Sequence, residues 1–225
     1  MEGEKVNGQE KKIRKEIKIS GFGGQGVILA GHIVGKAATI CDGKNATLTQ
    51  SYGPEARGGA CSANLIISNG EIDYPEIISP YLLVAMSQEA FENFSPELRE
   101  KGMLLIDEDL VEIKELREDI RLFKIPATRI AEELGKRIIA NIVMLGFFTA
   151  VSNIVSYDAM KKAVLSTVPK GTEKLNENAF ESGYKYGIEK YKDAIRCRNN
   201  AKKKKSSSNK KNSKIDKRNN NGKDK

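Results

Sequence analysis

Short apolar runs that alternate with helical segments are the feature that most constrains how this chain can fold. Each run is bounded by polar or turn residues, as expected of strands that are buried on both faces of a parallel sheet. Helical periodicity separates several of the runs and dominates the second half of the chain. The pattern predicts an α/β fold: a mostly parallel sheet with helices on both faces, in a Rossmann-like layer sandwich with a helical C-terminal half.

The boundaries of these segments follow from the apolar pattern and from the turn residues between them. Asn69-Gly70 accepts the positive φ angles of a tight hairpin, so we expect one after the third strand. The predicted strands are 17–20, 46–50, 60–68, 81–85, 103–107 and 120–125. The predicted helices are 27–41, 126–135, 138–155, 157–167 and 172–192.

A glycine-rich motif follows the first predicted strand and opens the first predicted helix. Backbone N–H groups at a helix N-terminus attract anions, and glycine lets a phosphate approach the backbone. A dinucleotide site also needs an acidic residue at the end of the second strand, where the sequence reads TLTQS at 47–51. The alternatives are a phosphate-bearing ligand, an NAD or FAD site, or a tight turn that packs internally or meets a partner. The motif is a literal GxGxxG, Gly21-Phe22-Gly23-Gly24-Gln25-Gly26.

A second loop, QSYGPEARGG at 50–59, leaves the second predicted strand at the same edge of the sheet as the glycine motif. In open α/β sheets this edge binds ligands. Arg57 can clamp a carboxylate or phosphate through paired hydrogen bonds, and Tyr52 adds an aromatic face. The alternative is a structural pair of Glu55 with Arg57. The candidate cofactor-binding or subunit-interface residues of this loop are Tyr52, Glu55, Arg57, Gly58 and Gly59.

Basic residues are concentrated at the C-terminus. Residues 196–225 hold 13 of the 38 Lys and Arg but only 2 of the 30 Asp and Glu, which leaves 25 basic and 28 acidic residues in 1–195. The net charge of +8 therefore describes a tail and gives no support for a nucleic-acid-binding face. Because the tail has few apolar residues, we expect it to be disordered. We predict a flexible arm at 1–14, a folded domain at 15–192 and a Lys/Asn/Ser-rich tail at 193–225.

Catalytic and metal-binding side chains are scarce. The three cysteines, Cys41, Cys61 and Cys197, form no CxxC pair, and His32 is the single histidine. Zinc and iron–sulfur sites are built from clustered cysteine and histidine ligands, and nucleophilic triads need a histidine base. We therefore predict no metal site in this chain, and a nucleophilic triad has little to be built from. His32 is predicted to be a structural residue on an apolar helix.

The segment 138–157 runs 20 residues without a charge, which is the length of a membrane span. Thr149, Ser152, Asn153 and Ser156 recur at helical spacing and form a polar stripe on an otherwise apolar helix. We predict a core helix, with part of its apolar arc covered by a partner subunit, and no membrane association. The N-terminus has no apolar stretch of a secretory signal, so we expect a cytoplasmic protein.

Four segments, in this order and spacing, resemble the gamma subunit of 2-oxoacid:ferredoxin oxidoreductases. The resemblance covers roughly residues 15–192, and within the family the sequence is most similar to the separate gamma subunit of archaeal 2-oxoglutarate synthases. The two glycine-rich motifs together are far more specific than GxGxxG alone. The four segments are GFGGQGV at 21–27, TQSYGPEARGGACSANLIIS at 49–68, IDYPEIISPYLLVAMSQEA at 72–90 and ANIVMLG at 140–146.

The resemblance implies a subunit, inactive alone, of an enzyme that converts 2-oxoglutarate, coenzyme A and oxidised ferredoxin to succinyl-CoA, CO2 and reduced ferredoxin. It implies alpha, beta and ferredoxin-like partner subunits that hold thiamine diphosphate, Mg2+ and iron–sulfur clusters, with ferredoxin as the electron acceptor. It therefore assigns this chain no catalytic residue and no cofactor bound by this chain alone. By the same resemblance, the loops at 21–26 and 52–59 face the catalytic subunits and help to admit coenzyme A.

Two alternatives remain open at this point. Within the family, the chain resembles the gamma subunit of pyruvate, branched-chain or indolepyruvate ferredoxin oxidoreductases less closely, but gamma does not hold the oxoacid pocket and so discriminates weakly. From another class, a stand-alone nucleotide-binding regulatory domain accounts for GxGxxG and leaves the motif YGPEARGG at 52–59 without a role.

Overall fold

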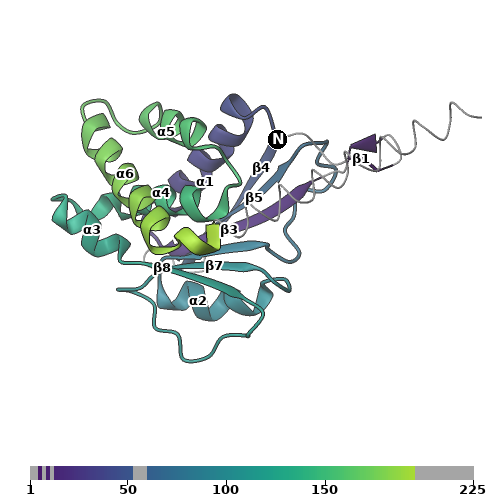
Figure 1. Cartoon of the computed structure of the whole chain (residues 1–225), viewed down its shortest axis with the longest axis horizontal. Coiled ribbons are helices and arrows are strands. Elements are labelled where there is room, and N and C mark those ends of the chain that lie inside the picture. The colour runs from purple at the N-terminus through teal and green to yellow at the C-terminus, as the bar shows by residue number, and fades with distance from the viewer. Residues whose placement is uncertain (1–4, 7–8, 11–12, 53–59, 196–225) are drawn as a thin grey trace, which may run out of the picture. The chain divides into compact units, whose positions relative to one another are not determined.

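A six-stranded sheet organises the fold, with the strand order β4-β5-β3-β6-β7-β8 (Figure 1). The strands β3, β6, β7 and β8 are parallel neighbours, whereas β5 is antiparallel to both β3 and β4. Five strands therefore share one direction, which confirms the mostly parallel sheet. All six predicted strands are present: β3 Arg14–Phe22, β4 Asn45–Tyr52, β5 Ala60–Ser68, β6 Leu82–Ala85, β7 Met103–Asp107 and β8 Arg121–Ile125.

The computed structural model describes residues 5–6, 9–10, 13–52 and 60–195. Contacts group residues 1–187 into one unit and assign 188–225 to a second. The N-terminal segment contributes a short ladder that the sequence pattern did not indicate, in which β1 Lys5–Val6 pairs antiparallel with β2 Gln9–Glu10. Of the predicted tail at 193–225, residues 196–225 lie outside the described residues.

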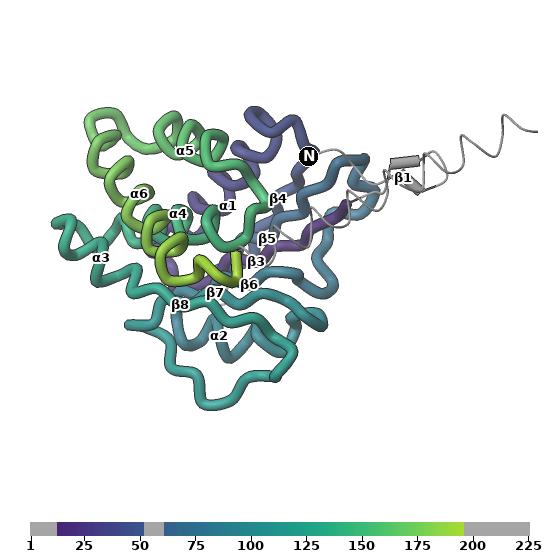
Figure 2. The backbone as a smooth tube through the Cα atoms, in the orientation of Figure 1, coloured from purple at the N-terminus to yellow at the C-terminus, as the bar shows by residue number. Residues whose placement is uncertain are grey.

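Helices cover both faces of the sheet, as predicted. Helix α1 packs on β3, β4 and β5, whereas α2 packs on β3 and β6 from the opposite face (Figure 1). The helices α4 and α5, green in Figure 2, pack on α1 and so lie on the same face of the sheet. The helices are α1 Val27–Lys36, α2 Gln88–Phe94, α3 Ala127–Glu133, α4 Ala140–Ser152, α5 Tyr157–Leu165 and α6 Glu173–Lys190, with a π-turn at Ala37–Cys41 and 3-10 turns at Ser95–Glu97 and Arg137–Ile139.

Helix α4 is the predicted core helix, but it is shorter than expected and is covered by the chain itself. All thirteen of its residues are buried, so the expectation that a partner subunit covers part of its arc is wrong. Two residues of the predicted polar stripe lie beyond the helix, since Asn153 is its left-handed C-cap and Ser156 caps α5. Among the described residues, none of the helices combines the length and hydrophobicity needed to cross a bilayer.

Glycines allow α6 to approach α4 closely. A Cβ added at Gly146 would lie 2.0 Å from the Phe180 carbonyl oxygen, and one added at Gly183 would lie 1.9 Å from the Val143 carbonyl oxygen. Both obstacles are backbone atoms, which cannot move without separating the helices. The two glycines therefore set the distance between α4 and α6, and this close packing helps to bury α4.

A second apolar core lies under α2 on the other face of the sheet. It joins side chains from β6, β7, α2 and the irregular segment that follows β7, so this segment is packed despite its lack of regular structure. Its buried members are Leu83, Ala85, Ala90, Phe91, Leu98, Leu104, Ile106, Val111 and Ile120.

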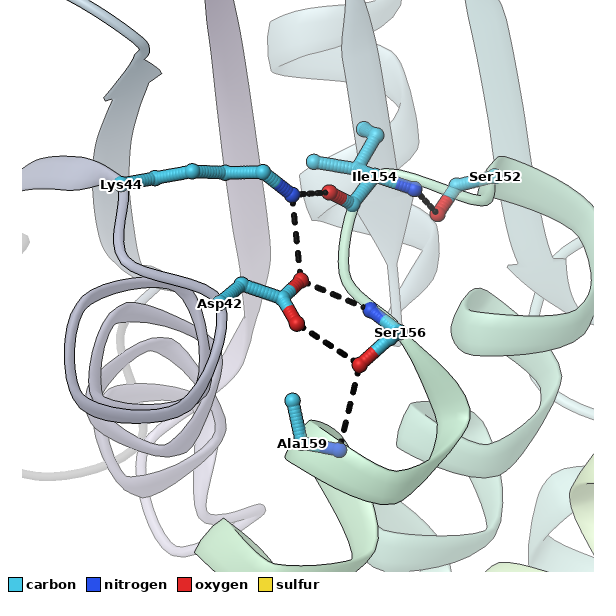
Figure 3. Close-up of polar contacts among 6 residues, drawn as sticks. All are labelled: Asp42, Lys44, Ser152, Ile154, Ser156 and Ala159. Carbon is cyan, nitrogen blue, oxygen red and sulfur yellow. Dashed lines mark hydrogen bonds and ion pairs between the residues drawn. The ribbon is translucent and has the colours of Figure 1, made fainter. Parts of the chain in front are cut away.

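Asp42 ties the turn after α1 to the connection between α4 and α5 (Figure 3). Its carboxylate accepts hydrogen bonds from Ser156 Oγ at 2.7 Å, from Ser156 N at 2.9 Å and from Lys44 Nζ at 3.1 Å. Lys44 Nζ also donates to the Ile154 carbonyl at 2.6 Å. Burial raises the pKa of Asp42, but these bonds outweigh it and hold the pKa below its ordinary value.

Two further predictions are wrong. Asn69-Gly70 forms no tight hairpin, because neither residue has a positive φ and the next strand begins only at Leu82. The Asn69 side chain instead accepts a hydrogen bond from Ile13 N at 2.7 Å, which joins the end of β5 to the start of β3. His32 is exposed on α1 and is not a buried structural residue, because the chain leaves this side of the helix uncovered.

Candidate functional site

The carboxyl ends of β3 and β6 form a topological switch point. The two strands are parallel neighbours, and the helices that follow them, α1 and α2, pack on opposite faces of the sheet. Open α/β sheets bind ligands in the crevice at such a point. Two segments flank it: the glycine loop, residues 21–26, which begins with the last two residues of β3, and Met86 and Ser87 after β6.

Gln25 braces the glycine loop from inside. Its Oε1 accepts a hydrogen bond from Phe22 N at 2.7 Å, and its Nε2 donates to the Met86 carbonyl at 2.8 Å. A Cβ added at Gly21 would lie 2.3 Å from Gln25 Oε1, so glycine is needed there to make room for this side chain. The Gln25 amide is therefore engaged on both sides and joins the ends of the two strands.

Asn141, in the first turn of α4, contacts the same loop. Its Nδ2 donates to the Gly26 carbonyl at 3.2 Å, and a Cβ added at Gly26 would lie 2.2 Å from Nδ2. Gly26 has a φ of +70°, and Gly24 has a φ of +94° with no atom within 4 Å of an added Cβ outside its own chain neighbours. Sequence reasoning did not assign a role to Asn141; the one local signal is a buried amide in an apolar helix.

The start of α1 is electrostatically unbalanced. Gly26 occupies the N-cap position, no side chain caps the helix, and its first turn contains no acidic residue. The first N–H groups of a helix carry a partial positive charge and lack intrahelical acceptors. Gly23 and Gly24 are exposed at this position. The loop therefore presents an accessible site with positive potential.

The register of the sheet places the second predicted loop beside the first. Tyr52, the last residue of β4, pairs with Cys61 of β5, and Cys61 pairs in turn with Gly21. Ala60, where β5 begins, pairs with Phe22. Tyr52 and Ala60, the described residues on either side of 53–59, therefore adjoin the glycine loop at the carboxyl edge. Four of its predicted site residues, Glu55, Arg57, Gly58 and Gly59, lie outside the described residues.

Cys61 and Asp107, two further residues with reactive side chains, are both buried. Burial raises the pKa of the Cys61 thiol, so it stays protonated near neutral pH. Within the described parts of the chain, no group of three or more His, Cys, Asp or Glu side chains could hold a metal ion. The buried Asp107 carboxylate accepts hydrogen bonds from Thr128 N at 2.9 Å and from Thr128 Oγ1 at 2.6 Å, which is a structural role at the start of α3.

Residues 16–186 match the family described as pyruvate ferredoxin/flavodoxin oxidoreductase. The match includes the glycine loop, both flanks of the second loop and α4. This chain belongs to that family. The resemblance predicted from the four sequence motifs is thereby confirmed.

Relatives and a solved structure agree with this assignment. The chain is 52% identical over 186 residues to 2-oxoglutarate synthase subunit KorC of Methanocaldococcus jannaschii, which covers 82% of this chain and 100% of the relative. It is 31% identical over 183 residues to pyruvate synthase subunit PorC of the same organism, covering 78% of this chain and 98% of the relative. The gamma subunit of a keto/oxoacid ferredoxin oxidoreductase from Geobacter sulfurreducens shares 43% identity and a TM-score of 0.70, covering 78% of this chain and 97% of that one.

Proposed function

We propose that this chain is the gamma subunit of a CoA-acylating 2-oxoglutarate:ferredoxin oxidoreductase. The observation that carries the proposal is the identity to two subunits of one organism, 52% to KorC and 31% to PorC over nearly equal lengths. Both relatives are matched over almost their whole length, so the difference does not arise from partial overlap. The difference favours 2-oxoglutarate over pyruvate as the oxoacid of the complex.

The subunit acts with alpha, beta and ferredoxin-like chains of one cytoplasmic complex. Thiamine diphosphate, Mg2+ and iron–sulfur clusters belong to those partners and supply the decarboxylation and electron transfer, with ferredoxin as the acceptor. This division is supported by the side chains of the described residues, among which no group of three or more His, Cys, Asp or Glu could hold a metal ion. This subunit contributes by binding coenzyme A or the catalytic subunits and holding them in position.

The carboxyl edge of the sheet contacts coenzyme A or the catalytic subunits. The uncapped start of α1 suits a phosphate group, and the space beside Gly24 lets one approach the backbone. Phe22 and Leu29, at 40% and 37% exposure, add apolar surface that suits a partner chain. We propose that Arg57, which lies between Tyr52 and Ala60 in the sequence, supplies a guanidinium for the coenzyme A phosphates.

The choice of oxoacid is tested with the reconstituted complex. Coenzyme A-dependent ferredoxin reduction is measured with 2-oxoglutarate, pyruvate and 3-methyl-2-oxobutanoate. We expect the highest kcat/KM with 2-oxoglutarate. A higher value with pyruvate or the branched-chain acid would overturn the assignment.

Arg57→Ala tests the role of the carboxyl edge in the same complex. If Arg57 contacts coenzyme A, the loss of a charge-assisted hydrogen bond of about 1.5–3 kcal/mol raises the KM for coenzyme A roughly 10-fold to 150-fold. Weaker assembly with an unchanged KM would instead identify an interface residue. A lower melting temperature that Glu55→Ala reproduces, with unchanged kinetics, would identify a structural pair.

A further inference from the structure

The amino edge of the sheet, at the opposite end of β3 and β6 from the glycine loop, carries a crowded group of cations. Lys15 Nζ lies 3.9 Å from the centroid of the Tyr81 ring, Arg99 Cζ lies 4.4 Å from it and Arg121 Cζ lies 5.7 Å from it. Attraction to the ring offsets part of the repulsion among the three charges. An approaching anion would offset more, because like charges this close repel one another.

The pKa of Tyr81 reflects the same three cations. Burial raises the pKa of its phenol, but a hydrogen bond from Arg121 Nη2 at 3.0 Å and the charges of Lys15, Arg121 and Arg99 outweigh burial and lower the pKa. The same three cations that stabilise a negative charge on Tyr81 would also stabilise a negative charge on a partner molecule bound next to them.

A hollow of about 500 Å³ adjoins this group. Of the cations that line it, Arg117 is neutralised by Asp119, with two contacts of 3.0 Å. The side chains of Arg99 and Lys101 make no ion pair or hydrogen bond with the described residues. Two exposed cations without an ionic partner indicate that an anionic group can bind here. The acidic side chains of Glu100 and Asp119 lie among them and interrupt the positive surface.

The segment 73–79, next to the hollow, is irregular but held in one conformation. Arg14 donates from Nη1 to the Tyr74 carbonyl and from Nη2 to the Glu76 carbonyl, both at 2.9 Å. Glu16 Oε2 accepts from Ile78 N at 3.3 Å and from the next N–H at 3.2 Å. The segment presents Ile78 at 78% exposure and Tyr74 at 51% exposure. Two large apolar side chains thus project into solvent from a backbone that hydrogen bonds hold in place, which is typical of a preorganised contact surface.

Ser79 connects the two features, because it follows Ile78 and also lines the hollow. We propose that this amino edge is a docking surface for a protein partner that presents an apolar pocket bordered by acidic side chains. Arg99 and Lys101 pair with the acidic side chains, and Ile78 and Tyr74 enter the pocket. The inference rests on the proposed function in one respect, since it expects the partner to be a chain of the same complex.

A protein fits these residues better than a nucleic acid does. Aromatic, aliphatic and arginine side chains in one patch are the composition of protein interfaces. A continuous phosphate backbone would meet Glu100 and Asp119, and the Tyr81 ring is covered by cations and offers no face for a base to stack on. A protein partner can match both signs of charge.

Two variants of the full chain test the proposal. Arg99→Glu/Lys101→Glu reverses the unpaired cations, and Ile78→Ser removes the apolar anchor. Lys162→Glu/Lys170→Glu is the matched control, because it makes the same charge change at exposed lysines elsewhere. All altered side chains are exposed, so the melting temperatures should stay at the parent value. The affinity of each chain for the other subunits is measured by titration at low salt, together with 2-oxoglutarate turnover of the complex.

We expect the charge reversal and Ile78→Ser each to raise the dissociation constant on the order of 10-fold, with little change in the control. Carbodiimide cross-linking of the parent complex should join Lys101 to a carboxylate of another chain. If the parent assembles into an active complex and both amino-edge variants bind equally well, the docking surface is refuted while the proposed function stands. If the parent does not assemble with these subunits, both are refuted. Loss of binding to a 20-nucleotide RNA, with subunit affinity unchanged, would identify a nucleic-acid site instead.

Discussion

Alanine in place of Gly26 tests the geometry of the glycine loop directly. Gly26 has a φ of +70°, and an added Cβ would lie 2.2 Å from Asn141 Nδ2. Gly24 provides the matched control, because its φ is +94° and an added Cβ has no atom within 4 Å beyond its chain neighbours. Both substitutions strain the backbone, but only Gly26→Ala also collides with a side chain.

The expected magnitudes follow from these contacts. A non-glycine residue in the left-handed region costs about 1–2 kcal/mol, so Gly24→Ala should lower the free energy of unfolding by that amount. Gly26→Ala carries the same strain and also displaces Asn141, which breaks its 3.2 Å hydrogen bond to the Gly26 carbonyl. Loss of that bond adds about 1 kcal/mol, for a total of about 2–3 kcal/mol.

A double-mutant cycle isolates the collision. In an Asn141→Ala background the obstacle and the hydrogen bond are both absent, so Gly26→Ala should cost only about 1–2 kcal/mol. Urea unfolding of the four proteins, with Gly24→Ala alongside, gives the coupling energy, which we expect to be about 1 kcal/mol. Equal costs of Gly26→Ala in the two backgrounds would refute the placement of Asn141 against the loop.

Two further predictions concern packing and pH. Gly183→Ala should lower the free energy of unfolding by about 1–3 kcal/mol, because the added Cβ meets a backbone oxygen. Gly35→Ala is the control: the nearest atom to its added Cβ would be 3.7 Å away, so it should be neutral or stabilising by up to about 1 kcal/mol. Thermal melting compares the two variants, and equal shifts in melting temperature would argue against the close α4–α6 packing. Because the pKa of Asp42 is held below its ordinary value of 3.8, its contribution to stability is present above that pH and is lost as the pH falls below it. Asp42→Asn should therefore be less stable near neutral pH and lose less stability on acidification, and unfolding curves that show the same acid dependence as the parent would contradict this.

Local patterns were sufficient for much of the fold. Every strand of the large sheet and the five helices singled out from the sequence were found near their predicted positions, because alternation and apolar runs report how a short segment is buried. Local patterns gave a wrong prediction for a polar dipeptide that can serve more than one structural purpose. Asn69-Gly70 has the composition of a hairpin, but the Asn69 side chain caps the start of β3 instead. The amphipathic pattern also did not reveal that α6 completes the burial of α4.

The sequence by itself determined the class of fold, the positions of its segments and, through four spaced motifs, the family. Only the tertiary structure decided that β5 runs antiparallel between β4 and β3, that Gln25 joins β3 to the end of β6, and that Asn141 closes on Gly26. The two side-chain contacts join residues that are far apart in the sequence: Gln25 and Met86 are 61 positions apart, and Asn141 and Gly26 are 115 positions apart. Periodicity describes which side of a segment is buried, whereas the identity of the neighbour depends on how strands are ordered across the whole sheet.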